Sequence, residues 1–196
     1  MDASQDITLP EGIYLTIHGG RALALTPDGE VLDWTLSAKG APLPLNGDTP
    51  IITIMGARCA KLLDLKHLPP FDILELFAFT CPAQFASPTV KGLCNALELA
   101  APEDIEDYPL ALIEIIQELF ATLRTYPDKE RQSLLEIAAA MGRQGEGWAW
   151  TPFIFAALGE TYDPRIPVTP KDVMAIWKDL PEWAEDAPKP DGAHHD

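Results

Sequence analysis

Short β-type segments separated by turn signals occupy the start of the chain, and they restrict its fold more than any other feature. Residues 13–17 (IYLTI) are β-branched and aromatic, the pattern resumes at 22–25, and it returns over 30–36. Residues 26–29 (TPDG) form a reversing turn, because proline presets φ and glycine accepts a positive φ. We therefore expect three antiparallel strands joined as a meander.

Two later segments extend the strand pattern. Residues 51–55 (IITIM) form a short apolar run, which is typical of a buried strand. Residues 71–79 (FDILELFAF) fit either a buried strand or a strand that runs into a helix, and the spacing of their apolar residues leaves both open. The sequence therefore predicts an α/β fold.

Helical patterns dominate the rest of the chain. Ser87 as N-cap and Pro88 as first helical residue start one helix, and another runs from about Glu103 or Asp107 to Arg124. The long helix has an apolar stripe made of Leu112, Ile113, Ile116, Leu119, Phe120 and Leu123. Further helices are predicted over 57–65, 128–141, 151–158 and 169–180.

These patterns divide the chain into three parts. Residues 1–126 form the α/β domain, residues 127–180 a helical extension, and residues 181–196 a proline-rich acidic linker or tail. Apolar residues make up 47% of the 196-residue chain, which is enough for a packed core.

Charge limits the partners that the chain can bind. The formal net charge is −16, with 30 acidic residues against 14 Lys and Arg. A chain of this charge repels a phosphate backbone, so direct DNA binding should be weak or absent, and a basic protein is the easier partner. The polar N-terminus is not a signal peptide, and no apolar run approaches the roughly 18 residues of a membrane span, so a cytoplasmic location is expected.

No complete catalytic or cofactor motif is present in the sequence. Residues 142–147 (GRQGEG) lack the Lys-Ser/Thr pair of a phosphate-binding loop, and Gly19-Gly20 lacks the third glycine of a dinucleotide fingerprint. The cysteines, Cys59, Cys81 and Cys94, are odd in number and lie in apolar stretches, which favours buried thiols. The four histidines show no ligand spacing, and no cofactor is expected.

Four tryptophans stand out as candidate interaction residues: Trp148, Trp150, Trp177 and Trp183. Aromatic side chains can stack on single-stranded bases, but few cations accompany these. Packing in the core or against another domain is therefore the favoured interpretation.

The order of these elements resembles the DnaQ-like (DEDD) 3′–5′ exonuclease fold, a ribonuclease H-like mixed sheet flanked by helices. More narrowly, residues 71–83 (FDILELFAFTCPA), the Trp148-Ala149-Trp150 segment and residues 180–183 (LPEW) resemble the exonuclease-like N-terminal region of alphaproteobacterial DinG-type ATP-dependent DNA helicases. The resemblance covers most of residues 10 to 188. It implies a helicase motor domain or another protein as the partner.

The chain departs from that family at the positions that carry its chemistry. Active enzymes of the fold hold two divalent metal ions with four carboxylates. Residues 13–20 contain no acid, and Thr16 and His18 stand where an Asp-x-Glu pair would lie. Residues 56–61 offer no acid either, and Asp64 comes about a turn late. Asp107 matches the third motif, but Pro102 takes the place of its His or Tyr.

The sequence therefore predicts a catalytically silent exonuclease-like module that serves as an accessory or docking domain of a DinG-type helicase system in DNA repair or replication. No Walker motif is present, so ATPase activity would belong to another polypeptide or region. Two alternatives remain open. One is an active nuclease that holds Mg²⁺ through Asp64, Asp72 and Asp107. The other is an acidic adaptor that binds a basic protein.

Overall fold

The computed structural model of the chain describes residues 7–36, 48–143 and 147–165. Five strands form one mixed sheet in the order β3-β2-β1-β4-β5. Strands β1 (Ile13–His18), β2 (Arg21–Leu25) and β3 (Val31–Thr35) form the predicted antiparallel meander. Strands β4 (Ile51–Thr53) and β5 (Phe71–Asp72) run parallel to β1, so the carboxyl ends of these three strands lie at one edge of the sheet.

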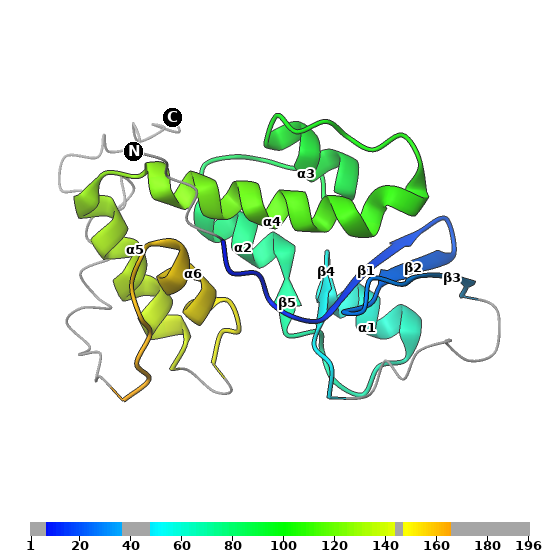
Figure 1. Cartoon of the computed structure of the whole chain (residues 1–196), viewed down its shortest axis with the longest axis horizontal. Coiled ribbons are helices and arrows are strands. Elements are labelled where there is room, and N and C mark those ends of the chain that lie inside the picture. Colours follow the sequence, from blue (N-terminus) through cyan, green and yellow to red (C-terminus); the bar gives the residue numbers. More distant parts are fainter. Residues whose placement is uncertain (1–6, 37–47, 144–146, 166–196) are drawn as a thin grey trace, which may run out of the picture.

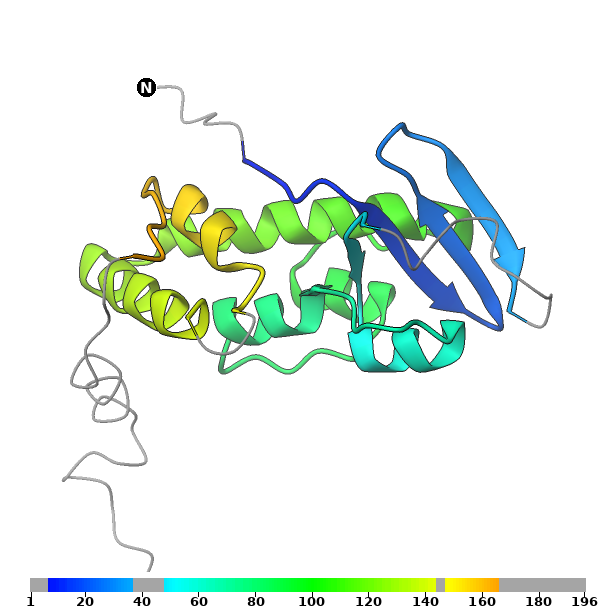
Figure 2. The same cartoon turned by 90° about the horizontal axis from the view of Figure 1, so that it is seen from below.

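One long helix covers one face of this sheet. Helix α4 (Tyr108–Thr125) follows the short 3-10 turn η1 (Ile105–Asp107), and it packs against β1 and β2 as well as against α2 (Ile73–Thr80) and α3 (Val90–Ala96). The predicted apolar stripe is buried apart from Ile113, which is half-buried. Figures 1 and 2 show the meander at one end of α4 and helices α5 and α6 at the other.

Helix α1 (Gly56–Leu63) belongs to the opposite face. There Cys59 packs with Ile13, Leu15 and Ile51, and Leu63 lies against the same cluster. The period-2 alternation of a strand explains this division, because Tyr14 belongs instead to the large cluster that contains the buried face of α4.

The helical extension packs into the large cluster. Helix α5 (Asp128–Met141) and helix α6 (Thr151–Ala157) contact each other, and α6 contacts α4. Ala138 and Trp150 belong to the same buried cluster as Phe71 at the edge of the sheet. The extension is therefore continuous with the core of the α/β part.

Strand β4 is shorter than predicted, and the structure decides between the two alternatives for segment 71–79. Strand β4 ends at Thr53 rather than at residue 55, because Met55 adopts a left-handed conformation with φ of 59°. The segment 71–79 is the strand-into-helix alternative, with a two-residue strand followed by α2. The predicted helix over 169–180 and the predicted tail over 181–196 lie outside the described residues.

The start of α3 was predicted wrongly by two residues. Thr89, not Ser87, is the N-cap, and its hydroxyl accepts a hydrogen bond from the Gly92 amide at 3.0 Å. Pro88 disfavours a helical conformation for Ser87, whose carbonyl instead accepts from the Thr89 amide at 2.7 Å. A Cβ at Gly92 would lie only 2.3 Å from the Ser87 carbonyl oxygen, so this tight entry requires glycine.

Candidate functional site

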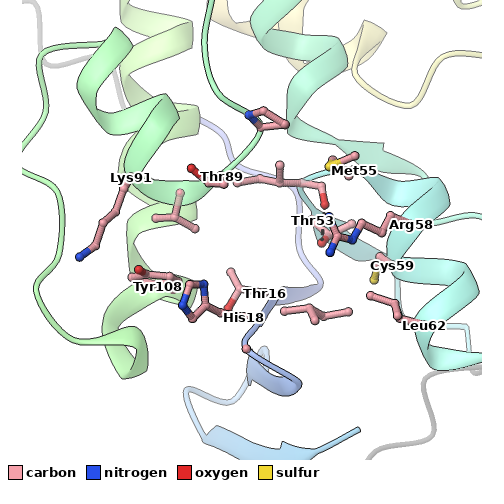
Figure 3. Close-up of a pocket in the computed structure, with 15 residues that line it drawn as sticks. Thr16, His18, Thr53, Met55, Arg58, Cys59, Leu62, Thr89, Lys91 and Tyr108 are labelled. Carbon is pink, nitrogen blue, oxygen red and sulfur yellow. Dashed lines mark hydrogen bonds between the residues drawn. The ribbon is translucent and has the colours of Figure 1, made fainter.

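A cavity of about 290 Å³ lies beyond the carboxyl ends of β1 and β4. Its walls come from the end of β1, the β4–α1 junction, the first turn of α3 and Tyr108 at the start of α4. Figure 3 shows these side chains gathered around one hollow. Ligands of open α/β sheets bind at the carboxyl ends of strands, so this is the candidate site that the topology favours.

The charge of the cavity wall is opposite to that of the chain. His18, Arg58 and Lys91 line the cavity, whereas its lining, drawn from the described residues, includes no Asp or Glu. All three basic side chains are exposed. In Figure 3, Arg58 enters from α1 and Lys91 stands on α3 across the hollow.

The alternation of β1 places its polar end in this cavity. Thr16 and His18 follow Tyr14 at period 2, so they lie on the α4 face of the strand. The His18 ring makes an edge contact with the ring of Tyr108, with centroids 5.6 Å apart and planes at 76°. The family resemblance assigns carboxylates to the positions of Thr16 and His18, and neither side chain can supply one.

Two buried threonines in the cavity wall differ in their hydrogen bonding. The Thr53 hydroxyl donates to the Leu15 carbonyl at 2.8 Å. The Thr16 side chain is only 5% exposed, yet its hydroxyl has no hydrogen-bond partner among the described residues. A buried hydroxyl without a partner is unusual in a folded protein and calls for a physical explanation.

Asp72, one of the three candidate metal ligands, serves the fold. Its carboxylate accepts hydrogen bonds from the amides of Gly56 at 2.6 Å, Leu74 at 3.0 Å and Met55 at 3.1 Å. It therefore caps α2 and also holds the left-handed turn at which α1 begins. These three hydrogen bonds explain why an aspartate occurs at position 72 without invoking a metal ion.

The other two candidate acids are exposed and lie on separate elements. Asp64 ends α1 in a left-handed conformation with φ of 52°, and Asp107 precedes α4 without a side-chain cap bond. In the part of the chain that the structure describes, no three His, Cys, Asp or Glu side chains are grouped so that they could hold a metal ion. The structure therefore does not bring Asp64, Asp72 and Asp107 together.

The tryptophans of the extension have structural partners. Trp150 is fully buried, donates its indole N–H to the Asp72 carbonyl at 3.0 Å and packs edge-on against Phe71. This is the core alternative of the sequence interpretation, and it leaves no Trp150 surface for a partner. Trp148 is half-buried and donates to the Glu75 carboxylate at 2.9 Å. Trp177 and Trp183 lie outside the described residues.

The cysteines are free thiols, two of them buried. Burial raises the pKa of Cys59, which also lines the cavity, to about 11. Desolvation raises the pKa of Cys81 and Cys94 as well. A thiol that stays protonated near neutral pH is a poor nucleophile, so the shared cavity of Cys59 and His18 does not favour thiol catalysis.

Sequence reasoning missed Arg58, Lys91 and Tyr108 as residues of the site. Carboxylates, thiols and histidines are recognisable in the sequence as candidate site residues, whereas these three side chains stand on helices that meet only in the folded chain. One signal was present, because Arg58 comes soon after the buried strand predicted over 51–55, and residues that follow parallel strands gather at one sheet edge.

Comparisons with protein-family models, with curated proteins and with solved structures found no match for this chain. Among the described residues, no helix is long and apolar enough to cross a bilayer.

Proposed function

We propose that the chain is a ribonuclease H-like module of the DnaQ exonuclease type that has no nuclease activity and serves a DinG-type helicase system as an accessory or docking domain. The strand order β3-β2-β1-β4-β5, with β1, β4 and β5 parallel, is consistent with that fold. The long helix α4 on one face and α1 on the other fit the same architecture.

The observation that carries the proposal is the chemistry of the cavity at the ends of β1 and β4. A two-metal nuclease needs carboxylates there, because they hold the metal ions that stabilise the attacking and the leaving oxygen at the phosphorus atom. The cavity lining instead contains Arg58 and Lys91, whose positive charges repel divalent cations. Asp72 is the last residue of β5, and its carboxylate already accepts hydrogen bonds from three backbone amides.

Exposed apolar side chains support the docking part of the proposal. Phe85, in the connection between α2 and α3, is 91% exposed, and Leu68, before β5, is 67% exposed. Phe85 and Leu68 are therefore the two most exposed large apolar side chains of the described residues, and they are candidate contacts for a partner. The net charge of −16 further favours a protein partner with a basic surface over DNA itself.

The nuclease part is tested by calorimetric titration with Mg²⁺ and Mn²⁺ together with cleavage assays on single-stranded and double-stranded DNA. We expect no stoichiometric metal binding and no cleavage above that of a buffer control. Metal-dependent cleavage that Asp107→Ala abolishes would overturn this part, and the active-nuclease alternative would replace it.

The docking part is tested with a purified DinG-type helicase motor, by measuring binding and ATPase rate with and without the chain. We expect saturable binding that Phe85→Ser and Trp183→Ala weaken. Val31→Ser is the matched control, because Val31 is an apolar side chain 47% exposed on the meander. If the motor does not bind, or if Val31→Ser weakens binding as much as Phe85→Ser does, the docking role is wrong.

A further inference from the structure

The cavity at the ends of β1 and β4 concentrates positive charge on a strongly acidic protein. The chain carries a net charge of −16, whereas the only charged or titratable nitrogen bases in the cavity lining, drawn from the described residues, are His18, Arg58 and Lys91, with no carboxylate beside them. Random placement of 30 acids and 14 Lys and Arg would favour the opposite composition. We infer that this cavity binds a small organic phosphomonoester without the help of a metal ion.

The two permanently charged side chains of the cavity, Arg58 and Lys91, have no ion-pair partner among the residues that the structure describes. By contrast, Arg21, Arg131 and Arg165 each form an ion pair. Figure 3 shows Arg58 and Lys91 on opposite sides of the hollow. A guanidinium donates two parallel hydrogen bonds to a phosphate, and an ammonium supplies a second charge, so the pair matches a dianion better than a single carboxylate.

Hydroxyl donors complete the polar wall. Thr16 lines the cavity, and its buried hydroxyl has no hydrogen-bond partner among the described residues. The Thr89 hydroxyl accepts from the Gly92 amide, which leaves its own hydrogen free to donate. Tyr108 adds a phenolic hydroxyl to the lining. A phosphate oxygen in the cavity would give these donors the acceptor that the protein does not provide.

The remaining wall is apolar, which argues for an organic ligand rather than a bare ion. Ile54, Leu62 and Val90 line the cavity. The cavity volume is about 290 Å³, whereas one water molecule occupies about 30 Å³ in the liquid. The cavity therefore has room for an organic group in addition to a phosphate. The apolar side chains would contact the carbon part of the ligand while Arg58 and Lys91 hold its phosphate.

The test is a binding titration of the full chain, by calorimetry and amide NMR, in a phosphate-free buffer that contains EDTA. The probe is phenyl phosphate, with inorganic phosphate, benzoate and phenol as comparisons. We expect saturable binding of phenyl phosphate, roughly tenfold or more tighter than that of each comparison compound, a ratio that corresponds to about one matched charged or apolar contact. The NMR shifts should concentrate at residues 16–18, 53–59 and 89–91.

Variants separate a built site from diffuse electrostatic attraction. Arg58→Gln should weaken phenyl phosphate binding by roughly tenfold, the loss expected for one charge-assisted contact, and Lys91→Gln by a smaller factor. Thr16→Val should also weaken it, while thermal unfolding shows that the variant remains folded. Arg131→Gln is the matched control, because it removes the same charge from α5, outside the cavity lining.

Three results would overturn the inference: no saturable binding of phenyl phosphate at millimolar concentration, binding that appears only when Mg²⁺ replaces EDTA, or equal losses in Arg58→Gln and Arg131→Gln. Inorganic phosphate binding as tightly as phenyl phosphate would overturn the organic part. The inference does not depend on docking to a helicase, so a negative motor-binding experiment leaves it standing.

Discussion

Two neighbouring regions along the parallel strands of the sheet differ in how their polar groups are hydrogen-bonded. Around β5, the Asp72 carboxylate accepts three backbone amides and its carbonyl accepts the indole N–H of Trp150. Around the ends of β1 and β4, the Thr16 hydroxyl has no hydrogen-bond partner within the described residues, and Arg58 and Lys91 line the cavity without an ion-pair partner among those residues. The polar groups of the first region are satisfied within the fold, whereas those of the second are the ones that we infer bind a ligand.

The largest loss in the free energy of unfolding should come from a substitution in the packed region around β5. Trp150→Ala removes a fully buried indole that contacts Phe71 and Phe120, so we expect a loss of about 3–5 kcal/mol in the free energy of unfolding. Urea denaturation followed by circular dichroism measures it. Trp148→Ala, at a half-buried tryptophan, should lose clearly less. Equal losses would mean that Trp150 does not anchor the extension to the sheet.

Two aspartates at helix N-cap positions provide a second comparison of stability, with a smaller expected effect. Asp72→Ala leaves three backbone amides without their acceptor, and we expect a loss of about 2–3 kcal/mol. Asp107 also precedes a helix but makes no cap hydrogen bond, so Asp107→Ala should change stability by less than about 0.5 kcal/mol. A larger loss for Asp107 than for Asp72 would contradict the structural role assigned to Asp72.

Alkaline pH should loosen the packed core through Tyr14, whose hydroxyl donates to the Pro10 carbonyl at 2.9 Å. Burial raises the pKa of Tyr14 from 10.0 to about 12. The folded state therefore holds this proton more tightly than the unfolded state, so the contribution is complete below about pH 10 and is lost as the pH rises towards about 12. The loss should be on the order of 2 kcal/mol.

The measurement is urea denaturation of the native chain and of Tyr14→Phe from about pH 8 to 12. The stability difference between them should shrink across the upper part of that range, because the variant has no phenol to ionise. Burial of Cys59 adds a loss in the same direction that begins near its ordinary pKa of 9.0, and this loss should appear in both proteins. A constant difference between the two proteins would show that Tyr14 is not the group responsible.

The smallest effects should distinguish the two cavity threonines. Thr53→Val removes a hydroxyl bonded to the Leu15 carbonyl and should cost about 1 kcal/mol. Thr16→Val replaces an unpartnered hydroxyl by a methyl group of similar size, so stability should be unchanged or slightly higher. Thermal unfolding of both variants provides the comparison. A loss in Thr16→Val as large as in Thr53→Val would show that the Thr16 hydroxyl already has a partner in the folded protein.

Local patterns were sufficient for most elements of the fold. The meander was predicted from β-branched runs and a proline–glycine turn, and α4 and α5 from the spacing of their apolar residues. The errors fell where a contact distant in sequence, or a competing local bond, decides the backbone. Asp72 stabilises the turn that shortens β4, and the Ser87–Thr89 hydrogen bond moves the start of α3.

The sequence by itself determined the succession of strands and helices, the acidic charge and the lack of carboxylates on the first strand, because each of these depends on residues close together in the chain. Only the tertiary structure decided that β4 and β5 lie parallel to β1 and that Trp150 and Asp72 belong to the core. It also decided that Thr16, Arg58 and Lys91 surround one cavity. These features join residues tens of positions apart, and their geometry follows from how the helices pack on the sheet rather than from any local pattern.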